Sequence, residues 1–115
     1  MTHESRGIER MERLKMLTQQ NPLDPFLRYA LGLEWEKHAH WQKAEQIWRD
    51  LLLKHPNYLP ALHRLAELLF AQQKFTEAHA FASDALRCAE SEADEHAKQV
   101  AHGLLAQIEE EMNLE

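Results

Sequence analysis

Hydrophobic residues recur along this chain with the spacing of α-helices. Ile8, Met11, Leu14 and Leu17 come at every third position, which predicts a first helix over residues 8–20. The polar residues between them would form the solvent-facing side of that helix. The same periodicity predicts five more helices, at about 25–38, 41–54, 59–72, 75–90 and 93–112. No strand pattern is visible, so the sequence predicts an all-α protein.

Short polar turns separate these segments and carry signals for helix starts. In NPLDP, Asp24 can accept hydrogen bonds from the free amides of the next helix, and Pro25 suits its first turn. Ser91, which is followed by several acidic residues, predicts the cap of the last helix, because acidic side chains favour a helix N-terminus. We therefore expect six helices joined by short loops.

Similar residues recur 34 positions apart along the chain. The pairs are Leu31 and Leu65, Trp41 and Phe75, Ala44 and Ala78, Leu52 and Leu86, and Pro22 and Pro56. The tetratricopeptide repeat, a helix–turn–helix unit, has this same period. In that family the first helix reads W-x2-L-G-x2-Y and the second A-x3-F, with a closing proline. The chain resembles a small tetratricopeptide-repeat protein.

Two segments carry the motif. In the first repeat, the matching residues are Arg28, Leu31, Gly32, Trp35, Ala44, Trp48 and Pro56. In the second repeat, they are Leu62, Leu65, Ala66, Leu69, Ala78, Ala82 and Glu90. Three of these positions depart from the pattern, namely Arg28, Ala82 and Glu90. The turns within the repeats carry Ala39 and Gln73 where such repeats often use glycine. The pattern therefore does not define the exact residues at which these helices end.

The resemblance implies an α-solenoid, a right-handed superhelix of about six antiparallel helices in a single domain over residues 1–115. It would consist of a half repeat at 8–24, full repeats at 25–58 and 59–92, and a capping helix at 93–112. Small residues would sit where the paired helices cross, namely Gly32, Ala44, Ala66 and Ala78. Large residues would fill the spaces between neighbouring helices, namely Trp35, Trp41, Trp48 and Phe75.

Composition narrows the classes of partner. The net charge is −6 and no basic stripe is present, which argues against a nucleic-acid partner. The single cysteine, Cys88, excludes an internal disulfide and is compatible with a reducing compartment. No stretch approaches the roughly 20 apolar residues of a membrane span, and the charged N-terminal segment lacks the apolar core of a signal peptide. We expect a cytoplasmic protein without a membrane partner.

Eight histidines raise the question of a metal site. A zinc site needs three or four ligands, and no histidine pair has the four-residue spacing of HExxH. His38 and His40 fall at a turn, and surface histidines explain the count better than a metal does. There is no nucleophile elbow, glycine-rich phosphate loop or cysteine–histidine motif. The sequence predicts no enzyme and no cofactor, and a histidine-rich metal protein is the weaker alternative.

The resemblance implies that the first helix of each repeat lines a concave groove. The partner-binding residues would be Phe26, Tyr29, Leu33, Glu36, Lys37, His63, Glu67 and Phe70, with the three aromatic residues as anchors. The lysine–asparagine clamp with which some members hold acidic peptide ends is absent at these positions, so we expect an apolar segment as ligand. The last helix could add Ala97, Lys98, Ala101, Leu104 and Leu105, or it could cover the groove.

These patterns predict a non-catalytic protein–protein interaction module that binds a peptide or partner protein in its groove. The alternative is a self-associating scaffold subunit that uses exposed repeat edges. In that case a homodimer would join through the side of the first helix that carries Ile8, Met11 and Leu14, because a repeat cannot bury its face alone.

Overall fold

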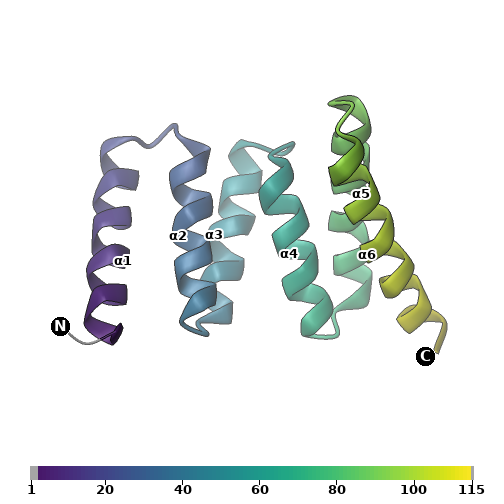
Figure 1. The fold of residues 1–115 in the computed structure, drawn as a ribbon, viewed down its shortest axis with the longest axis horizontal. Helices are drawn as coiled ribbons and strands as arrows, with labels where there is room; N and C mark the ends of the chain where they lie inside the picture. The colour runs from purple at the N-terminus through teal and green to yellow at the C-terminus, as the bar shows by residue number, and fades with distance from the viewer. Residues whose placement is uncertain (1–2, 115) are drawn as a thin grey trace. The chain divides into compact units, whose positions relative to one another are not determined.

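The computed structural model describes residues 3–114, and the side chains of residues 6, 7 and 9–114. Within these residues the chain forms six helices and no strand, as Figure 1 shows. The helices are α1 (His3–Gln20), α2 (Pro25–Lys37), α3 (Trp41–Lys54), α4 (Leu59–Ala71), α5 (Phe75–Ser91) and α6 (Glu95–Leu114). The prediction of an all-α protein with six helices in this order is confirmed.

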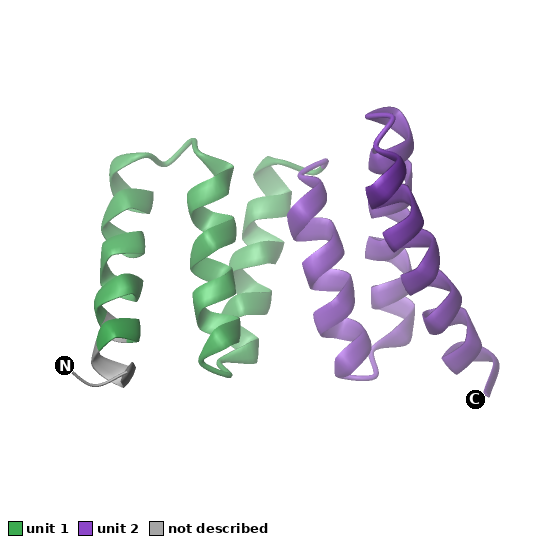
Figure 2. Cartoon of the chain, viewed as in Figure 1, with its two compact units in different colours: residues 1–56 green, residues 57–115 purple. Residues whose placement is uncertain are grey.

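The chain divides into two compact units, residues 1–56 and 57–115, which Figure 2 shows in two colours. Unit 1 contains α1, α2 and α3, and α2 packs against both of the others. Unit 2 contains α4, α5 and α6, and here α5 packs against both of the others. The boundary between the units lies close to the predicted repeat boundary at 58/59. The assignment of residues 1–115 to a single domain, with its internal divisions, stays a prediction.

Two predicted helix starts differ from the structure. α1 begins at His3 rather than at residue 8, because the apolar periodicity marks only the first core-facing position and good helix formers precede it. α6 begins at Glu95, and its cap is Asp94, whose Oδ1 accepts from the N–H of Ala97 at 3.0 Å. Ser91 is the last residue of α5 and does not cap α6. The predicted cap Asp24 is confirmed, since its Oδ1 accepts from the N–H of Phe26 at 2.9 Å.

Three helices end in the same type of turn. One residue after each C-cap takes a left-handed backbone conformation, with φ of 62° at Ala39, 62° at Gln73 and 55° at Ala93. The next N–H then reaches back to the carbonyl five positions earlier, at 2.9 Å in each turn; the bonds run from His40 to Trp35, Lys74 to Leu69 and Asp94 to Ala89. This Schellman geometry satisfies free carbonyls at the helix end. Ala39 and Gln73, where glycine is the common residue, therefore occupy equivalent turns.

The core of unit 1 is built on a close crossing of α2 and α3. Gly32 and Trp48 are both buried, and a Cβ atom placed on Gly32 would collide with the indole Nε1 of Trp48. The indole N–H donates to the backbone carbonyl of Tyr29 at 3.3 Å, so the polar atom of the buried ring is satisfied. Trp48 thus occupies the space that the missing side chain of Gly32 leaves open.

The core of unit 2 places alanines at the equivalent positions of α4 and α5. Ala66 and Ala82, which stand one repeat period after Gly32 and Trp48, are fully buried. The bulk of this core comes instead from fully buried large residues, namely Leu65, Leu69 and Ile108. Leu31 and Leu65, the first pair in the repeat, are 9% and 0% exposed, so both belong to the core of their unit.

One of the predicted packing residues was assigned wrongly. Trp41 is 48% exposed, because it is the first residue of α3 and projects at the helix end, where only part of the ring meets neighbouring residues. Its counterpart Phe75 begins α5 in the same way but is more covered, with its ring centroid 5.7 Å from that of Phe70. Trp35 is half-buried, and Trp48 alone among the tryptophans is fully buried.

Candidate functional site

Five of the eight predicted binding residues lie on α2 in unit 1. Phe26 is 60% exposed and Lys37 is also exposed, whereas Tyr29, Leu33 and Glu36 are half-buried. Their spacing of three or four positions places them on one side of the helix. The centroid of the Tyr29 ring lies 6.3 Å from that of the buried Trp48 ring, so Tyr29 packs against the core of unit 1.

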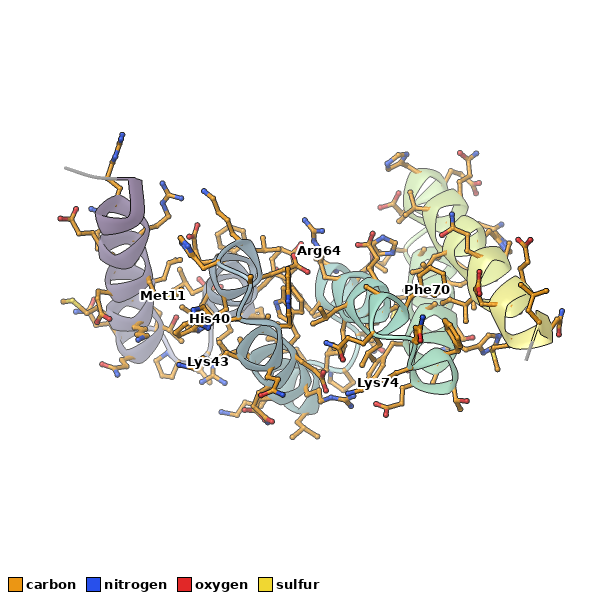
Figure 3. All side chains as sticks on the ribbon, turned by 90° about the horizontal axis from the view of Figure 1, so that it is seen from below. Met11, His40, Lys43, Arg64, Phe70 and Lys74 are labelled. Atoms are coloured by element: carbon orange, nitrogen blue, oxygen red, sulfur yellow. The ribbon has the colours of Figure 1, made fainter. Side chains whose placement is uncertain are left out.

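The other three predicted residues lie on α4 in unit 2, four and three positions apart. His63 Nε2 lies 3.4 Å from Glu67 Oε1, one helical turn away. The same oxygen lies 3.8 Å from Nη1 of Arg64, so Glu67 stands between two basic groups. The Phe70 ring packs against Phe75 beside the α4–α5 turn, and Figure 3 labels Phe70 at this place. These residues give α4 a mixed polar and aromatic surface.

The two surfaces correspond position by position along the repeat. Tyr29 and His63, Leu33 and Glu67, and Glu36 and Phe70 are each separated by one repeat period. In unit 1 the series is aromatic, aliphatic and acidic, whereas in unit 2 it is basic, acidic and aromatic. Each unit therefore presents its own chemistry at equivalent positions. We call the five predicted residues on α2 the α2 face and the three on α4 the α4 face.

The contribution predicted for α6 needs correction. Ala101, Leu104 and Leu105 are only 1%, 8% and 9% exposed, so they belong to the core of unit 2 and do not line an open surface. The reason is that α6 packs along α5 and also contacts α4, and these residues are buried in that packing. The α4 face is not buried by α6, since the side chain of Glu67 keeps 44% of its exposure.

The side of α1 that was expected to form a dimer seam is also covered. Met11 is only 6% exposed, because the three-residue spacing that marks it as apolar turns it toward α2. Leu14 is half-buried, and the side chain of Ile8 lies outside the described side chains. The exposed apolar residues of α1 are Met16 and Leu17, at 57% and 42%.

Unit 1 contains a cavity of about 320 Å³ that sequence reasoning missed. Its lining residues come from α1, α2 and the α2–α3 turn, and they are Gly7, Met11, Glu12, Lys15, Trp35, His38 and His40. We call it the Trp35 cavity. Figure 3 labels two of these residues, Met11 and His40. The tryptophan was assigned to packing and the two histidines to the surface, because nothing in a linear sequence shows that α1 brings a lysine and a methionine to them.

Charged groups surround the indole of Trp35. Nζ of Lys43 lies 4.2 Å from the ring centroid and Nζ of Lys15 lies 5.3 Å from it, both within cation–π range. The ring of His40 meets the indole edge-on at 5.2 Å, with an angle of 84° between the ring planes. Trp35 therefore packs against its neighbours and also lines the cavity.

A polar cluster joins α1 to α2 beside this cavity. Arg10 Nη1 lies 3.1 Å from Glu34 Oε1, and His38 Nε2 lies 3.6 Å from Glu34 Oε2. His38 Nε2 and Glu34 Oε2 are both buried and have no hydrogen-bond partner. Gly7 lets the His38 ring lie directly against the backbone of α1, since a Cβ there would collide with Cε1 of His38.

A serine, a histidine and a glutamate meet on the surface of unit 2. One ring nitrogen of His79, Nε2, lies 3.0 Å from Glu109 Oε1, and the other, Nδ1, lies 3.5 Å from Ser83 Oγ. These are the residue types of a hydrolytic triad, but the serine contact is longer than the distance of about 2.6–3.2 Å expected between nucleophile and base. The contact between His79 and Glu109 instead links α5 to α6.

The thiol of Cys88 is buried and lies 3.6 Å from Asn57 Oδ1, to which it donates. Burial raises the pKa of this thiol; the nearby Arg87 opposes the rise, and Glu92 and Asp84 add to it. A raised pKa keeps the thiol protonated, which makes it a poor nucleophile. Among residues 3–114, no group of three or more histidine, cysteine or acidic side chains is placed to hold a metal ion.

Several solved structures share the fold of this chain. The chain is similar to PcrH, crystallised in complex with the chaperone binding region of PopD, with a TM-score of 0.84, 15% identity and coverage of 95% of this chain and 83% of that one. It is similar to protein BPP2914 from Bordetella parapertussis, with a TM-score of 0.75, 26% identity and coverage of 91% of both chains.

It is also similar to a tetratricopeptide repeat domain protein from Salinibacter ruber, with a TM-score of 0.72, 23% identity and coverage of 75% of this chain and 97% of that one. No protein-family model and no curated protein matches the sequence. The resemblance predicted from the repeat period is confirmed, and the chain has the tetratricopeptide-repeat fold, an all-α solenoid. No helix within residues 3–114 has the length and apolar character needed to cross a membrane.

Proposed function

We propose that this chain is a non-catalytic interaction module that binds a peptide or partner protein through the α2 face and the α4 face. The observation that carries the proposal is the pair of aromatic residues, Phe26 and Phe70, on helices that occupy the same place in their repeats. PcrH, which shares the fold, was crystallised with a segment of its partner PopD, and this supports a protein ligand. The lone, buried Cys88 fits the cytoplasmic location that we propose with it.

The α2 face supplies the apolar part of the proposed contact. Phe26 leaves 60% of its surface uncovered, so a partner could bury most of that ring. Tyr29 is held by Trp48, whose ring packs beside it and whose N–H binds its carbonyl. A residue that is already ordered loses little conformational entropy on binding, which favours affinity.

The α4 face supplies the polar part of the proposed contact. Glu67 is held between His63 and Arg64, and this leaves a fixed acceptor on the helix that carries Phe70. A segment with apolar side chains and a hydrogen-bond donor near them matches this chemistry. We expect an affinity in the micromolar range, about −8 kcal/mol, because the surface is short.

The test compares capture of partners from extracts of the native host by tagged variants. Phe26→Ala is the cleanest change, because this residue contributes little to the core, whereas Phe70→Ala also removes packing against Phe75. Leu53→Ala on α3 is the matched control, since Leu53 is 82% exposed and belongs to neither face. Captured proteins are quantified by mass spectrometry, and their segments are then measured as synthetic peptides.

We expect Phe26→Ala to weaken binding about 5- to 30-fold, as for a residue that contributes about 1–2 kcal/mol to an interface. Leu53→Ala should leave it unchanged. Equal capture by the wild type and both of these variants would contradict the proposed faces.

Self-association is the second candidate, and Met16 and Leu17 on α1 favour it. A helix that exposes two adjacent large apolar residues can bury them in a second copy. Light scattering over a concentration series tests this directly, with Met16→Glu against the Leu53→Glu control. A mass that stays at 13.5 kDa throughout would remove this candidate.

A further inference from the structure

We propose that this chain associates head to tail with further copies of itself, through the outer side of α1 on one copy and the outer side of α6 on the next. The outer side of each helix is the one turned away from its neighbours in the same unit. The inference rests on self-association, the second candidate above, and adds the surface that would meet Met16 and Leu17. It involves neither the α2 face nor the α4 face.

The two units differ strongly in charge. Residues 1–56 carry nine lysines and arginines against eight acidic residues, whereas residues 57–115 carry four against eleven, which gives formal net charges of +1 and −7. Two copies that met through unit 2 on both sides would bring many charges of one sign together, which is unfavourable. Contact between unit 1 of one copy and unit 2 of another avoids this repulsion.

The outer side of α1 combines a basic residue with the exposed apolar pair. Arg13 is exposed and forms no ion pair with any residue that the structure describes. Met16 and Leu17, three and four positions later, lie on the same side of the helix, away from the buried side that packs on α2. Glu9 also lies on this side, and a second arginine, Arg6, balances its charge. The outer side of α1 is therefore partly apolar and carries a net positive charge.

The outer side of α6 combines an acidic residue with small and apolar ones. Glu110 is exposed and forms no ion pair within the described part of the chain. Ala106 and Gly103, one and two turns before it, are exposed as well, and a Cβ placed on Gly103 would meet nothing within 4 Å. Leu114, one turn after Glu110, is 75% exposed. This side of α6 is opposite in charge to the outer side of α1 and leaves space for large side chains.

The two sides fit each other when the helices run antiparallel, as neighbouring helices do within each unit (Figure 1). With Arg13 opposite Glu110, the next turn of α1 places Leu17 over Ala106 and Gly103. A large side chain then lies against small ones, as it does at the α2–α3 crossing in unit 1. The apolar contact supplies the attraction, and the charge pair selects the partner surface and its register.

A contact between two different surfaces is heterologous, so each copy keeps one free side and the assembly can grow beyond two copies. A symmetric dimer through α1 alone would instead stop at two. The contact surface is short, so we expect weak association, with a Kd of roughly 100 µM, as is typical of small transient interfaces.

The test is sedimentation equilibrium of the full chain at concentrations from about 10 µM to about 1 mM, which bracket this Kd. The average mass of the wild type should pass twice 13.5 kDa at the highest concentration. Arg13→Glu and Glu110→Arg should each weaken the association at least about fivefold, because each change places like charges opposite one another. The double variant should associate as the wild type does, since its charge pair is only reversed.

A mixture of two blocked variants tests the polarity of the contact. Met16→Glu blocks α1 and leaves α6 intact, whereas Ala106→Glu blocks α6 and leaves α1 intact. Only one native contact can form between these two chains, because their other sides both carry an added acidic group. An equimolar mixture should therefore form a complex that stops at twice 13.5 kDa, and neither variant alone should associate.

Two further variants control for the change in net charge. Lys54→Glu on α3 and Glu90→Arg on α5 make the same changes of charge at exposed positions that lie on neither outer side. Both should leave the association unchanged. Circular dichroism of every variant checks that its helices are intact.

The proposal is overturned if the wild-type mass levels off at twice 13.5 kDa, which indicates a symmetric dimer, or if the double variant associates as weakly as the single ones. A mass of 13.5 kDa throughout overturns it together with the self-association candidate. Partner capture by the Phe26→Ala variant depends on none of these residues. Failure of the proposed interaction module can therefore be told apart from failure of this contact.

Discussion

The two units solve the same packing problem with different residues. At the closest approach of α2 and α3, unit 1 combines no side chain at Gly32 with the largest side chain at Trp48. At the equivalent positions of α4 and α5, unit 2 has only two methyl groups, from Ala66 and Ala82, and its core contains larger buried residues such as Ile108. Interiors are packed to a nearly constant density, but the position that supplies the volume can change. The comparison shows that the residue accepted on one helix at such a crossing depends on the size of the residue that faces it on the other helix.

The largest expected effect comes from emptying the unit 1 crossing. Trp48→Ala should destabilise the protein by about 3–5 kcal/mol, because it removes a fully buried ring and leaves a cavity above Gly32. Trp41→Ala is the matched control and should cost about 1 kcal/mol, since its ring is half exposed. Urea unfolding measures both, and similar costs for the two changes would contradict the assigned packing.

The next effect comes from filling that crossing. Gly32→Ala should destabilise by about 1–3 kcal/mol, because the new Cβ would collide with Nε1 of Trp48. On an exposed part of a helix the same change would stabilise by about 0.5–1 kcal/mol. Gly103 on α6 provides that control, since a Cβ there meets nothing within 4 Å. Thermal unfolding should therefore show opposite shifts for Gly32→Ala and Gly103→Ala.

A smaller gain is expected at the turns that the units share. Ala39→Gly and Gln73→Gly should each stabilise by about 0.5–1 kcal/mol, because glycine avoids the left-handed strain that a Cβ causes at positive φ. Ala80→Gly in the exposed middle of α5 is the control and should destabilise by a similar amount. A loss of stability on Ala39→Gly would show that the turn is not left-handed in solution.

The smallest effect concerns the thiol of unit 2. Because burial raises the pKa of Cys88, the folded chain holds the thiol proton more tightly than the unfolded chain does. Its small contribution to stability is thus present below the ordinary thiol pKa and is lost as pH rises through the folded value. Iodoacetamide should react more slowly with the native protein than with the urea-unfolded chain at mildly alkaline pH. Arg87→Gln should raise the pKa further, and a lower one would contradict the assigned cause.

The sequence was sufficient for the fold because the signals that define it are local or periodic. The regular spacing between Leu31 and Leu65 indicates equivalent helices without any knowledge of their contacts. Asp24 followed by Pro25 marks a helix start for the same reason, since cap and amide are close neighbours in the chain. The prediction for Ser91 was wrong because a serine followed by acidic residues can either cap the next helix or end the preceding one. The sequence pattern is the same in both cases.

The site was less predictable because it depends on which helices meet. Periodicity placed Ala101, Leu104 and Leu105 on one side of a helix, but only the structure shows that this side is buried in unit 2. The Trp35 cavity was missed for a related reason. Lys15 and Trp35 belong to different helices, and their contact depends on how α1 docks on α2. Phe26 is exposed, and its place in a partner-binding groove stays a prediction.

The most direct test of the shared crossing is the effect of Gly32→Ala in two backgrounds. In the wild-type chain we predict a loss of about 1–3 kcal/mol. In the Trp48→Ala chain the same change recreates the alanine pair of unit 2, and we predict a gain of about 0.5–1 kcal/mol from the better helix former. Urea unfolding of the four proteins gives this double-mutant cycle. An unchanged sign, with Gly32→Ala destabilising both backgrounds equally, would contradict the conclusion that Trp48 is the reason for glycine at position 32.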